Sequence, residues 1–299
     1  MPVSLKDRAL GAYVGLAVGD ALGATTEFMT PREIEVAYGV HDQIRGGGWL
    51  KLKPGQVTDD TEMSLALGQA IIEQGRVESQ AVAEAFSNWM RSKPVDIGNT
   101  VRRGIIHYRN SGQSCVEVNE YDAGNGACMR SLPIALYCCH ASEQTLREAS
   151  RLQAHTTHNN PLADAGTETV LKMLVGLING GDKAETRVLA DYLVMEYPEY
   201  RFDKRRVDNP SGYIVHTLQV VFQALFGHDD FRSILIDVVN RGGDADTTGA
   251  IAGMLAGACY GLESIPAEWL RKMDKKVIEA CQQQTIQLLS MAEEQRGAA

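Results

Sequence analysis

The sequence has little of what several classes of protein require. Its six cysteines include no CxxC pair, and two of them, Cys138 and Cys139, are adjacent, so a disulfide framework is not expected. The longest weakly polar stretches, Ala9–Ala24 and Ala250–Leu262, fall short of the roughly 20 apolar residues that span a bilayer. The N-terminus lacks the apolar core of a signal peptide. We therefore expect a soluble, cytoplasmic protein.

Positive charge is also scarce. The chain has 29 Lys and Arg against 38 Asp and Glu, a formal net charge of −9, and its one compact basic run is Lys204-Arg205-Arg206. Phosphate neutralisation supplies much of the affinity for nucleic acids, so this balance argues against a nucleic-acid-binding protein. We interpret the basic run as a solvated loop.

Alternating strand patterns are nearly absent, and the dominant hydrophobic period is helical. Apolar residues recur at helical spacing over 63–71, 82–90 and 170–178, and further helices are expected over 143–152, 184–196, 213–226, 230–240 and 274–294. No Pro/Gly/Ser-rich linker divides the chain. We predict an all-α protein in which residues 1–299 form a single compact multi-helix domain.

Two segments carry glycines at every fourth residue. These are Gly11, Gly15, Gly19 and Gly23 near the start of the chain and Gly249, Gly253 and Gly257 near its end. On a helix this spacing places the glycines on one face, where another backbone can approach closely. Glycine disfavours a helix by about 1 kcal/mol relative to Ala, so the rows predict a tightly packed pair of helices.

Acidic residues gather in two short segments, Thr58-Asp59-Asp60-Thr61-Glu62 and Gly243-Asp244-Ala245-Asp246-Thr247, each next to a predicted helix. One interpretation is helix capping, since Ser, Thr and Asp accept the unpaired N–H groups of a helix N-terminus. Adjacent acids exceed what a cap requires, however, and like charges this close cost free energy unless a cation neutralises them.

The second interpretation is therefore a metal site. If the two helix N-termini converge, they present four carboxylates and several hydroxyls, which select hard cations such as Mg²⁺ or Mn²⁺ and can hold two of them. No Cys/His set has the spacing of a zinc site.

Other segments allow a structural and a functional interpretation. Gly124-Asn125-Gly126 fits either a turn or a backbone cradle for phosphate. His158 fits a capping or solvated histidine, Asp96 an ordinary loop acid, and 45–49 a flexible surface loop.

Taken in order, these motifs resemble the ADP-ribosylglycohydrolases. The matching segments are Gly19-Asp20-Ala21-Leu22-Gly23 with Glu27, Thr58-Asp59-Asp60-Thr61, Asp96-Ile97-Gly98, Gly124-Asn125-Gly126-Ala127-Cys128-Met129-Arg130, Thr157-His158 and Gly243-Asp244-Ala245-Asp246-Thr247. They span nearly the whole chain. The resemblance implies an all-α fold that binds two divalent metals, with Mn²⁺ as the working ion and Mg²⁺ as the alternative.

The resemblance also implies roles for individual residues. The implied metal ligands are Thr58, Asp59, Asp60, Asp244, Asp246 and Thr247. Asp96 would act as an acid/base or substrate-orienting carboxylate, and Glu27 would face the ribose or the metals. Gly124, Asn125 and Gly126 would cradle the diphosphate, with His158 nearby and Tyr213 as a nucleoside contact.

Within this family, the resemblance implies hydrolytic removal of ADP-ribose from an arginine of dinitrogenase reductase, with a PII-type nitrogen signalling protein as a further partner. Two alternatives remain open. The chain would act on another linkage, such as ADP-ribosyl-serine or a small ADP-ribosylated molecule, or it would be a non-catalytic ADP-ribose-binding relative.

Overall fold

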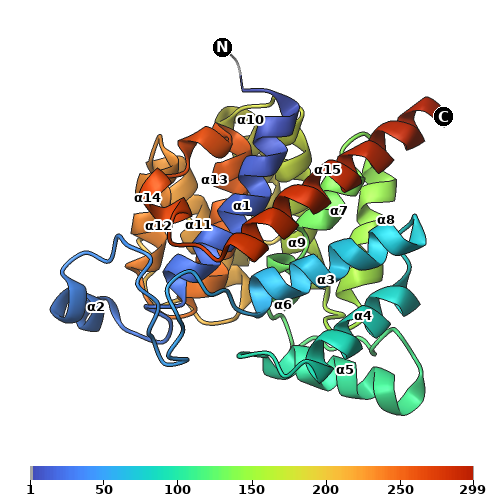
Figure 1. Cartoon of the computed structure of the whole chain (residues 1–299), viewed down its shortest axis with the longest axis horizontal. Helices are drawn as coiled ribbons and strands as arrows, with labels where there is room; N and C mark the ends of the chain where they lie inside the picture. The colour runs from blue at the N-terminus through green and yellow to red at the C-terminus, as the bar shows by residue number, and fades with distance from the viewer. Residues whose placement is uncertain (1–2, 299) are drawn as a thin grey trace.

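Helices form every regular element of residues 3–298, the part of the chain that the computed structural model describes (Figure 1). Within that range there is no β-strand, only isolated bridges between Gly47 and Leu52 and between Gly124 and Tyr213. The α-helices are α1 (Leu5–Gly23), α2 (Pro31–Tyr38), α3 (Asp59–Gln74), α4 (Ser79–Arg91), α5 (Asn99–Ser111), α6 (Gly126–Met129), α7 (Leu132–Tyr137), α8 (Glu143–Ala154), α9 (Pro161–Ile178), α10 (Lys183–Glu196), α11 (Ile214–Gly227), α12 (Phe231–Val239), α13 (Ala245–Tyr260), α14 (Ala267–Leu270) and α15 (Lys275–Ala298), with short 3₁₀ turns at Pro198–Tyr200 and Leu262–Ser264. The predicted all-α class is confirmed.

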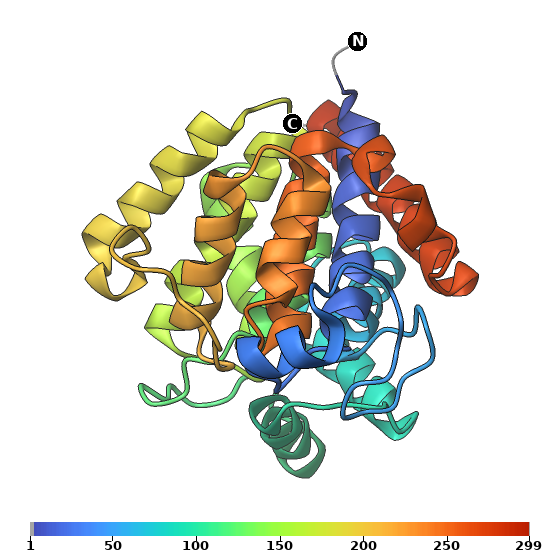
Figure 2. The ribbon, with the colours of Figure 1, turned by 90° about the vertical axis from the view of Figure 1, so that its left-hand side faces the viewer.

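The glycine rows form the centre of the molecule, where α1 and α13 pack against each other in antiparallel orientation (Figure 2). A Cβ atom added to Gly19 would lie 1.9 Å from the Gly249 carbonyl oxygen, and one added to Gly253 would lie 2.0 Å from the Gly15 carbonyl oxygen. Since real side chains do not approach a backbone so closely, only glycine permits this contact. The predicted tight helix pair is confirmed.

The remaining helices surround this pair. Helices α9, α11, α12 and α15 pack on it from different sides, and one continuous hydrophobic cluster runs from Ala9 in α1 to Ala292 in α15. No helix within residues 3–298 has the length and apolar character needed to cross a membrane.

Antiparallel packing brings the end of α1 next to the start of α13. A Cβ on Gly23, the last residue of α1, would lie 2.1 Å from the carbonyl oxygen of Ala245, the first residue of α13. In Figure 2 this end of the pair lies at the bottom of the molecule, opposite the N-terminus. The segment after α1, which carries Glu27, therefore meets the acidic segment at the start of α13, although the two are more than 200 residues apart in sequence.

Candidate metal centre

A cavity of about 690 Å³ opens at this end of the helix pair. This volume lies within the usual range for small-molecule sites. Acidic side chains from four separate segments line it, together with aromatic and glycine-rich segments, and we call it the acidic cavity. Its lining residues include Glu27, Phe28, Trp49, Asp59, Asp96, Gly98, Gly124, Asn125, Gly126, His158, Gly212, Asp244, Asp246 and Thr247.

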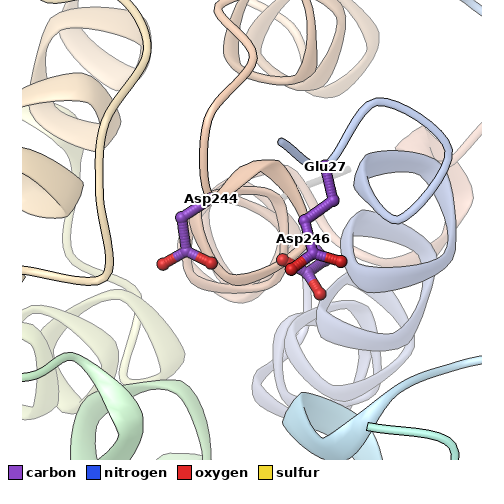
Figure 3. Close-up of side chains that lie close together, drawn as sticks. All are labelled: Glu27, Asp244 and Asp246. Carbon is purple, nitrogen blue, oxygen red and sulfur yellow. The ribbon is translucent and has the colours of Figure 1, made fainter. Parts of the chain in front are cut away.

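Three carboxylates meet at the start of α13. Glu27, from the segment after α1, points toward Asp246 in the first turn of α13, with Asp244 beside them (Figure 3). One carboxylate oxygen of each residue lies within 4.8 Å of the others, a spacing that a shared metal ion can satisfy. Glu27 and Asp246 are buried.

Asp60 completes the group from α3. It is fully buried, and its Oδ2 accepts hydrogen bonds from the hydroxyls of Thr58 at 3.1 Å and Thr247 at 3.4 Å. Its Oδ1 is buried without a hydrogen-bond partner in the described part of the chain. An unpaired buried carboxylate oxygen is costly, and a cation is the natural partner that would offset this cost. We call Glu27, Asp59, Asp60, Asp244 and Asp246 the acid cluster.

Neither Thr58 nor Asp244 caps the helix that follows it. Thr58 precedes α3 and Asp244 precedes α13, yet neither side chain accepts a hydrogen bond from the first turn of its own helix. The Thr58 hydroxyl bonds to Asp20 and Asp60 instead, and Asp244 Oδ2 accepts from Asn125 Nδ2 at 2.5 Å. The capping interpretation therefore does not explain the two segments.

Asp20 performs the capping function from another helix. This fully buried residue of α1 accepts hydrogen bonds from the backbone N–H groups of Thr58 and Thr61, at 3.0 and 3.1 Å, and from both threonine hydroxyls. It thereby ties the start of α3 to the end of α1. Asp20 positions Asp59 and Asp60 without lining the cavity itself.

Trp49 fixes Glu27. Its indole Nε1 donates a 2.5 Å hydrogen bond to Glu27 Oε2, and its ring packs on Phe28 with 5.3 Å between centroids. The loop that carries Trp49 includes Gly46, Gly47 and Gly48, all with positive φ, and the Thr25 hydroxyl donates to the Gly46 carbonyl. The sequence predicted only a flexible surface loop at 45–49, whereas this loop is bonded to the segment that carries Glu27.

Asp59 and Asp96 also line the cavity. The Gly98 N–H donates to Asp59 Oδ2 at 3.4 Å, and Asp96 Oδ1 accepts from the N–H of Ile97 at 2.8 Å. Both carboxylates line the cavity, on the side that α3 and the start of α5 provide. Asp96 is thus close enough for its charge to raise the pKa of Asp59.

Burial raises the pKa of each carboxyl group here, and repulsion by neighbouring acids adds to this effect for Glu27, Asp59, Asp60, Asp244 and Asp246. The pKa rises to about 8 for Glu27, to about 8 for Asp59 and to about 6 for Asp20, and it is also raised for Asp60, Asp96, Asp244 and Asp246. For Asp59 the neighbouring charges of Asp96 and Asp20 add to the effect of burial. Without a cation these groups cannot all ionise near neutral pH, so protons or metal ions must compensate the charge.

The donor set therefore fits a divalent metal. It consists of carboxylate and hydroxyl oxygens, the ligands that Mg²⁺ and Mn²⁺ prefer. None of its carboxylates forms an ion pair with Lys or Arg within residues 3–298; the ion pairs there involve other acids, such as Asp122, Glu168 and Asp237.

The residues predicted to bind substrate lie in three different settings. Gly124 and Gly126 line the cavity, and a Cβ on Gly126 would lie 2.7 Å from His158 Cε1, so packing of the His158 ring also requires these glycines. Asn125 donates hydrogen bonds from its backbone N–H to the Gly212 carbonyl and from its side chain to Asp244, so it orients that acid. Tyr213 is not among the cavity-lining residues of the described chain; its ring packs edge-on against His216 at 5.2 Å.

Sequence reasoning assigned no role to Asp20, Trp49 or Arg130. Asp20 carried a signal, since it is the only acid in the weakly polar stretch Ala9–Ala24. Arg130, in one of the matched motifs, is fully buried and does not line the cavity, and the charge of Asp59 favours its ionised form. No sequence signal linked Trp49 to Glu27.

Fold and site together define the class. The chain belongs to the ADP-ribosylglycohydrolase family, whose model matches residues 1–298, as the motifs predicted. It is 50% identical over 290 residues to the ADP-ribosyl-(dinitrogen reductase) glycohydrolase of Rhodospirillum rubrum, covering 97% of this chain and 98% of that protein. It is 33% identical to ADP-ribosylarginine hydrolase Tri1 of Serratia proteamaculans, over 89% of this chain and 75% of that one. A solved structure described as an ADP-ribosylglycohydrolase-related protein complex matches with a TM-score of 0.86 and 32% identity, covering 97% of this chain and 99% of its own.

Proposed function

We propose that this chain is a metal-dependent hydrolase that removes ADP-ribose from an arginine of ADP-ribosylated dinitrogenase reductase and so restores nitrogenase activity. The observation that carries the proposal is 50% identity along nearly the full length of a glycohydrolase named for that substrate. The arginine linkage is also supported by the similarity to a hydrolase named for ADP-ribosylarginine. The acid cluster, all of whose members except Asp60 line a ligand-sized cavity, supports a reaction of this kind.

We propose that the metal ligands come from the two acidic segments: Thr58, Asp59, Asp60, Asp244, Asp246 and Thr247. Two ions, Mn²⁺ in preference to Mg²⁺, would balance the charge of the acid cluster. When bound, such ions supply Lewis-acid chemistry, polarising the oxygens they contact and lowering the pKa of coordinated water.

The remaining residues bind and orient the substrate in this proposal. The reaction breaks the C–N bond between ribose and the arginine guanidine, and water adds OH to the sugar carbon and a proton to the departing nitrogen. Asp96 and Glu27 line the cavity, and burial raises the pKa of both carboxyls. The value of about 8 for Glu27 suits a carboxyl that must exchange a proton near neutral pH. Asn125 holds Asp244, while Gly124, Gly126 and His158 form the wall proposed to face the diphosphate.

Several finer points belong to the same proposal. We place the protein in the cytoplasm, and we propose that residues 1–299 act as one domain. Tyr213 as a nucleoside contact and a PII-type nitrogen signalling protein as a partner stay predictions, because no feature of the described residues tests them.

Release of ADP-ribose tests the proposal directly. Wild-type protein with Mn²⁺ should release ADP-ribose from an ADP-ribosyl-arginine protein, and Asp246→Ala should lower kcat/KM at least about 100-fold because it removes a metal ligand. Asp191→Ala, which removes an exposed carboxylate of α10 that pairs with Arg187, is the matched control and should leave the rate unchanged.

A panel containing an ADP-ribosyl-serine peptide and small ADP-ribosylated molecules separates the alternatives. Preference for one of these would replace the arginine assignment. Equal activity in wild type and Asp246→Ala, or no activity of the wild type with any divalent metal, would refute the hydrolase itself.

A further inference from the structure

Arg130 is a buried cation with no carboxylate partner in the described part of the chain. Its Nε donates to Gln153 Oε1 at 2.9 Å, its Nη2 donates to the Gln153 carbonyl at 3.0 Å and to Thr157 Oγ1 at 2.8 Å, and its Cζ lies 4.3 Å from the Phe86 ring centre. Burial lowers its pKa to about 9, which still leaves the group charged at neutral pH. Because burying a charge is costly, the position and orientation of this guanidinium call for an explanation.

The hydrogen bond to Thr157 has a defined direction. A guanidinium only donates hydrogen bonds, so the Thr157 hydroxyl must accept from Arg130 and keeps its own hydrogen for another acceptor. Within residues 3–298, the other group bonded to that hydroxyl is His158 Nδ1, at 2.8 Å. A proton on Nδ1 would leave the hydroxyl hydrogen without an acceptor among the described residues, so the arrangement that satisfies both groups is the one in which the hydroxyl donates to Nδ1.

This direction determines the state of His158. If Nδ1 accepts a hydrogen bond, it carries no proton, and the ring proton lies on Nε2. His158 is 3% exposed, and burial together with the positive charges of Arg130 and Arg103 lowers its pKa to about 3, so the ring stays neutral. Both observations favour one neutral tautomer.

Nε2 faces the acidic cavity. His158 lines the cavity, and its Nε2 has no hydrogen-bond partner in the described protein. It lies 3.0 Å from where a Cβ of Gly124 would stand, so a side chain there would displace the ring. The free N–H thus points into space that a ligand can occupy.

We propose that Arg130 and Thr157 are positioning residues that hold His158 as the neutral Nε2–H tautomer, which presents a hydrogen-bond donor to an acceptor oxygen of the ligand. An imidazolium here would be a second buried positive charge beside Arg130, whereas a neutral ring donates a hydrogen bond without that cost. The statement that this oxygen belongs to an ADP-ribosyl group rests on the proposed function, whereas the tautomer assigned to His158 does not.

Ring-nitrogen NMR tests the tautomer without an activity measurement. Two-bond ¹H–¹⁵N spectra of the full-length protein labelled at its seven histidines should show His158 as a ring with bare Nδ1 and protonated Nε2 that does not titrate above about pH 5. His41, whose Nε2 lies 2.9 Å from the Leu22 carbonyl oxygen, should give a second ring of the same tautomer. The signal that disappears in His158→Gln identifies the residue. A protonated Nδ1, or a ring that titrates near its ordinary pKa, would overturn the proposal.

Variants test the chain of hydrogen bonds from Arg130 through Thr157 to His158. Thr157→Val removes the hydroxyl and should produce a mixture of tautomers, whereas Thr157→Ser keeps the hydroxyl and should give the wild-type spectrum. Thr156→Val is the matched control: it removes a neighbouring buried hydroxyl, which also contacts Arg130 but does not bond to His158. An unchanged ring in Thr157→Val, or the same change in Thr156→Val, would refute the role of Thr157.

Binding of free ADP-ribose tests whether this chain of hydrogen bonds serves the ligand. Thr157→Val should weaken binding about five- to tenfold, the effect of losing one well-oriented hydrogen bond, and Thr157→Ser should restore it. Full affinity in Thr157→Val would show that the tautomer does not serve the ligand. No binding by the wild type would count against the proposed function and leave the spectral test intact.

Discussion

At the scale of single residues, the acids that gather at the starts of α3 and α13 were predictable from the sequence, but the residues that hold them were not. Asp59, Asp60, Asp244 and Asp246 stand in short runs whose charge exceeds any capping need. By contrast, the bond from Trp49 to Glu27 joins residues 22 apart through a glycine-rich loop. Local spacing carries no information about such a contact, because it depends on the path of the loop in space.

Trp49→Phe tests the support of Glu27. This change keeps an aromatic ring beside Phe28 but removes the N–H donor, so the Glu27 carboxylate loses an orienting bond and its pKa rises further. We expect Mn²⁺ affinity, measured by titration calorimetry, to fall about tenfold, a typical effect of losing a hydrogen bond that orients a group at a metal site.

A second tryptophan provides the control for this experiment. Trp89 Nε1 donates to Glu62 Oε2 at 2.8 Å, and neither residue lines the acidic cavity. Trp89→Phe should therefore leave Mn²⁺ affinity unchanged. Equal affinities in wild type and Trp49→Phe would contradict the role given to Trp49.

At the scale of elements, a helix was easier to predict from the sequence when its buried apolar face was larger. Helices with long apolar faces, such as α4 and α9, were predicted from periodicity, whereas α5, which buries only Val101, Gly104 and Ile105, gave no clear pattern. The glycine rows predicted that two helices would pack closely. They did not reveal that the pairing is antiparallel, which is what brings Asp20 and Asp246 to one end.

Gly253→Ala tests the helix pair away from the acids. Its Cβ would lie 2.0 Å from the Gly15 carbonyl oxygen, and because neither backbone can move without separating α1 from α13, we expect the free energy of unfolding to fall by about 3 kcal/mol or more. Denaturant unfolding monitored by circular dichroism measures the change.

Gly176 of α9 is the matched control, since a Cβ there meets no neighbouring atom within 4 Å. Gly176→Ala should stabilise the protein by roughly 0.5–1 kcal/mol through helix propensity. If the two substitutions change stability equally, the close packing of the helix pair would not be required.

At the scale of the whole molecule, the cavity is assembled from segments spread over the chain, including the residues after α1, the starts of α3 and α13, and the loop before α6. The all-α class and the family were predictable, because helical periodicity and ordered motifs are both present in the linear sequence. The arrangement of the wall around His158 was not, because it depends on bridges such as that between Gly124 and Tyr213.

Stability of the metal-free protein should depend on pH in a defined direction. Glu27 and Asp59 have folded-state pKa values of about 8 against ordinary values of 4.5 and 3.8, so below pH 8 the folded state holds protons that the unfolded state releases. Stability is therefore lost as the pH rises through the folded-state values, and the melting temperature in EDTA should fall by about 3 °C or more between about pH 7 and pH 8.5.

This pH range avoids an opposing effect. His158 has a lowered pKa, so it contributes stability that increases with pH only below its ordinary value of 6.5. Glu27→Gln should reduce the slope, and Mn²⁺ should reverse it, because metal binding requires deprotonated ligands. A melting temperature that is constant or rises in EDTA over this range would contradict the charge balance assigned to the acid cluster.

The central claim is that the buried acids at the end of the α1–α13 pair hold divalent metal. Anomalous scattering at the manganese edge, from a crystal grown or soaked with Mn²⁺, tests it most directly. The account predicts two peaks between the first turns of α3 and α13, in contact with Asp60 and Asp246, and no peaks there in a crystal of Asp246→Ala. A fully soaked wild-type crystal without a peak at this position would contradict it.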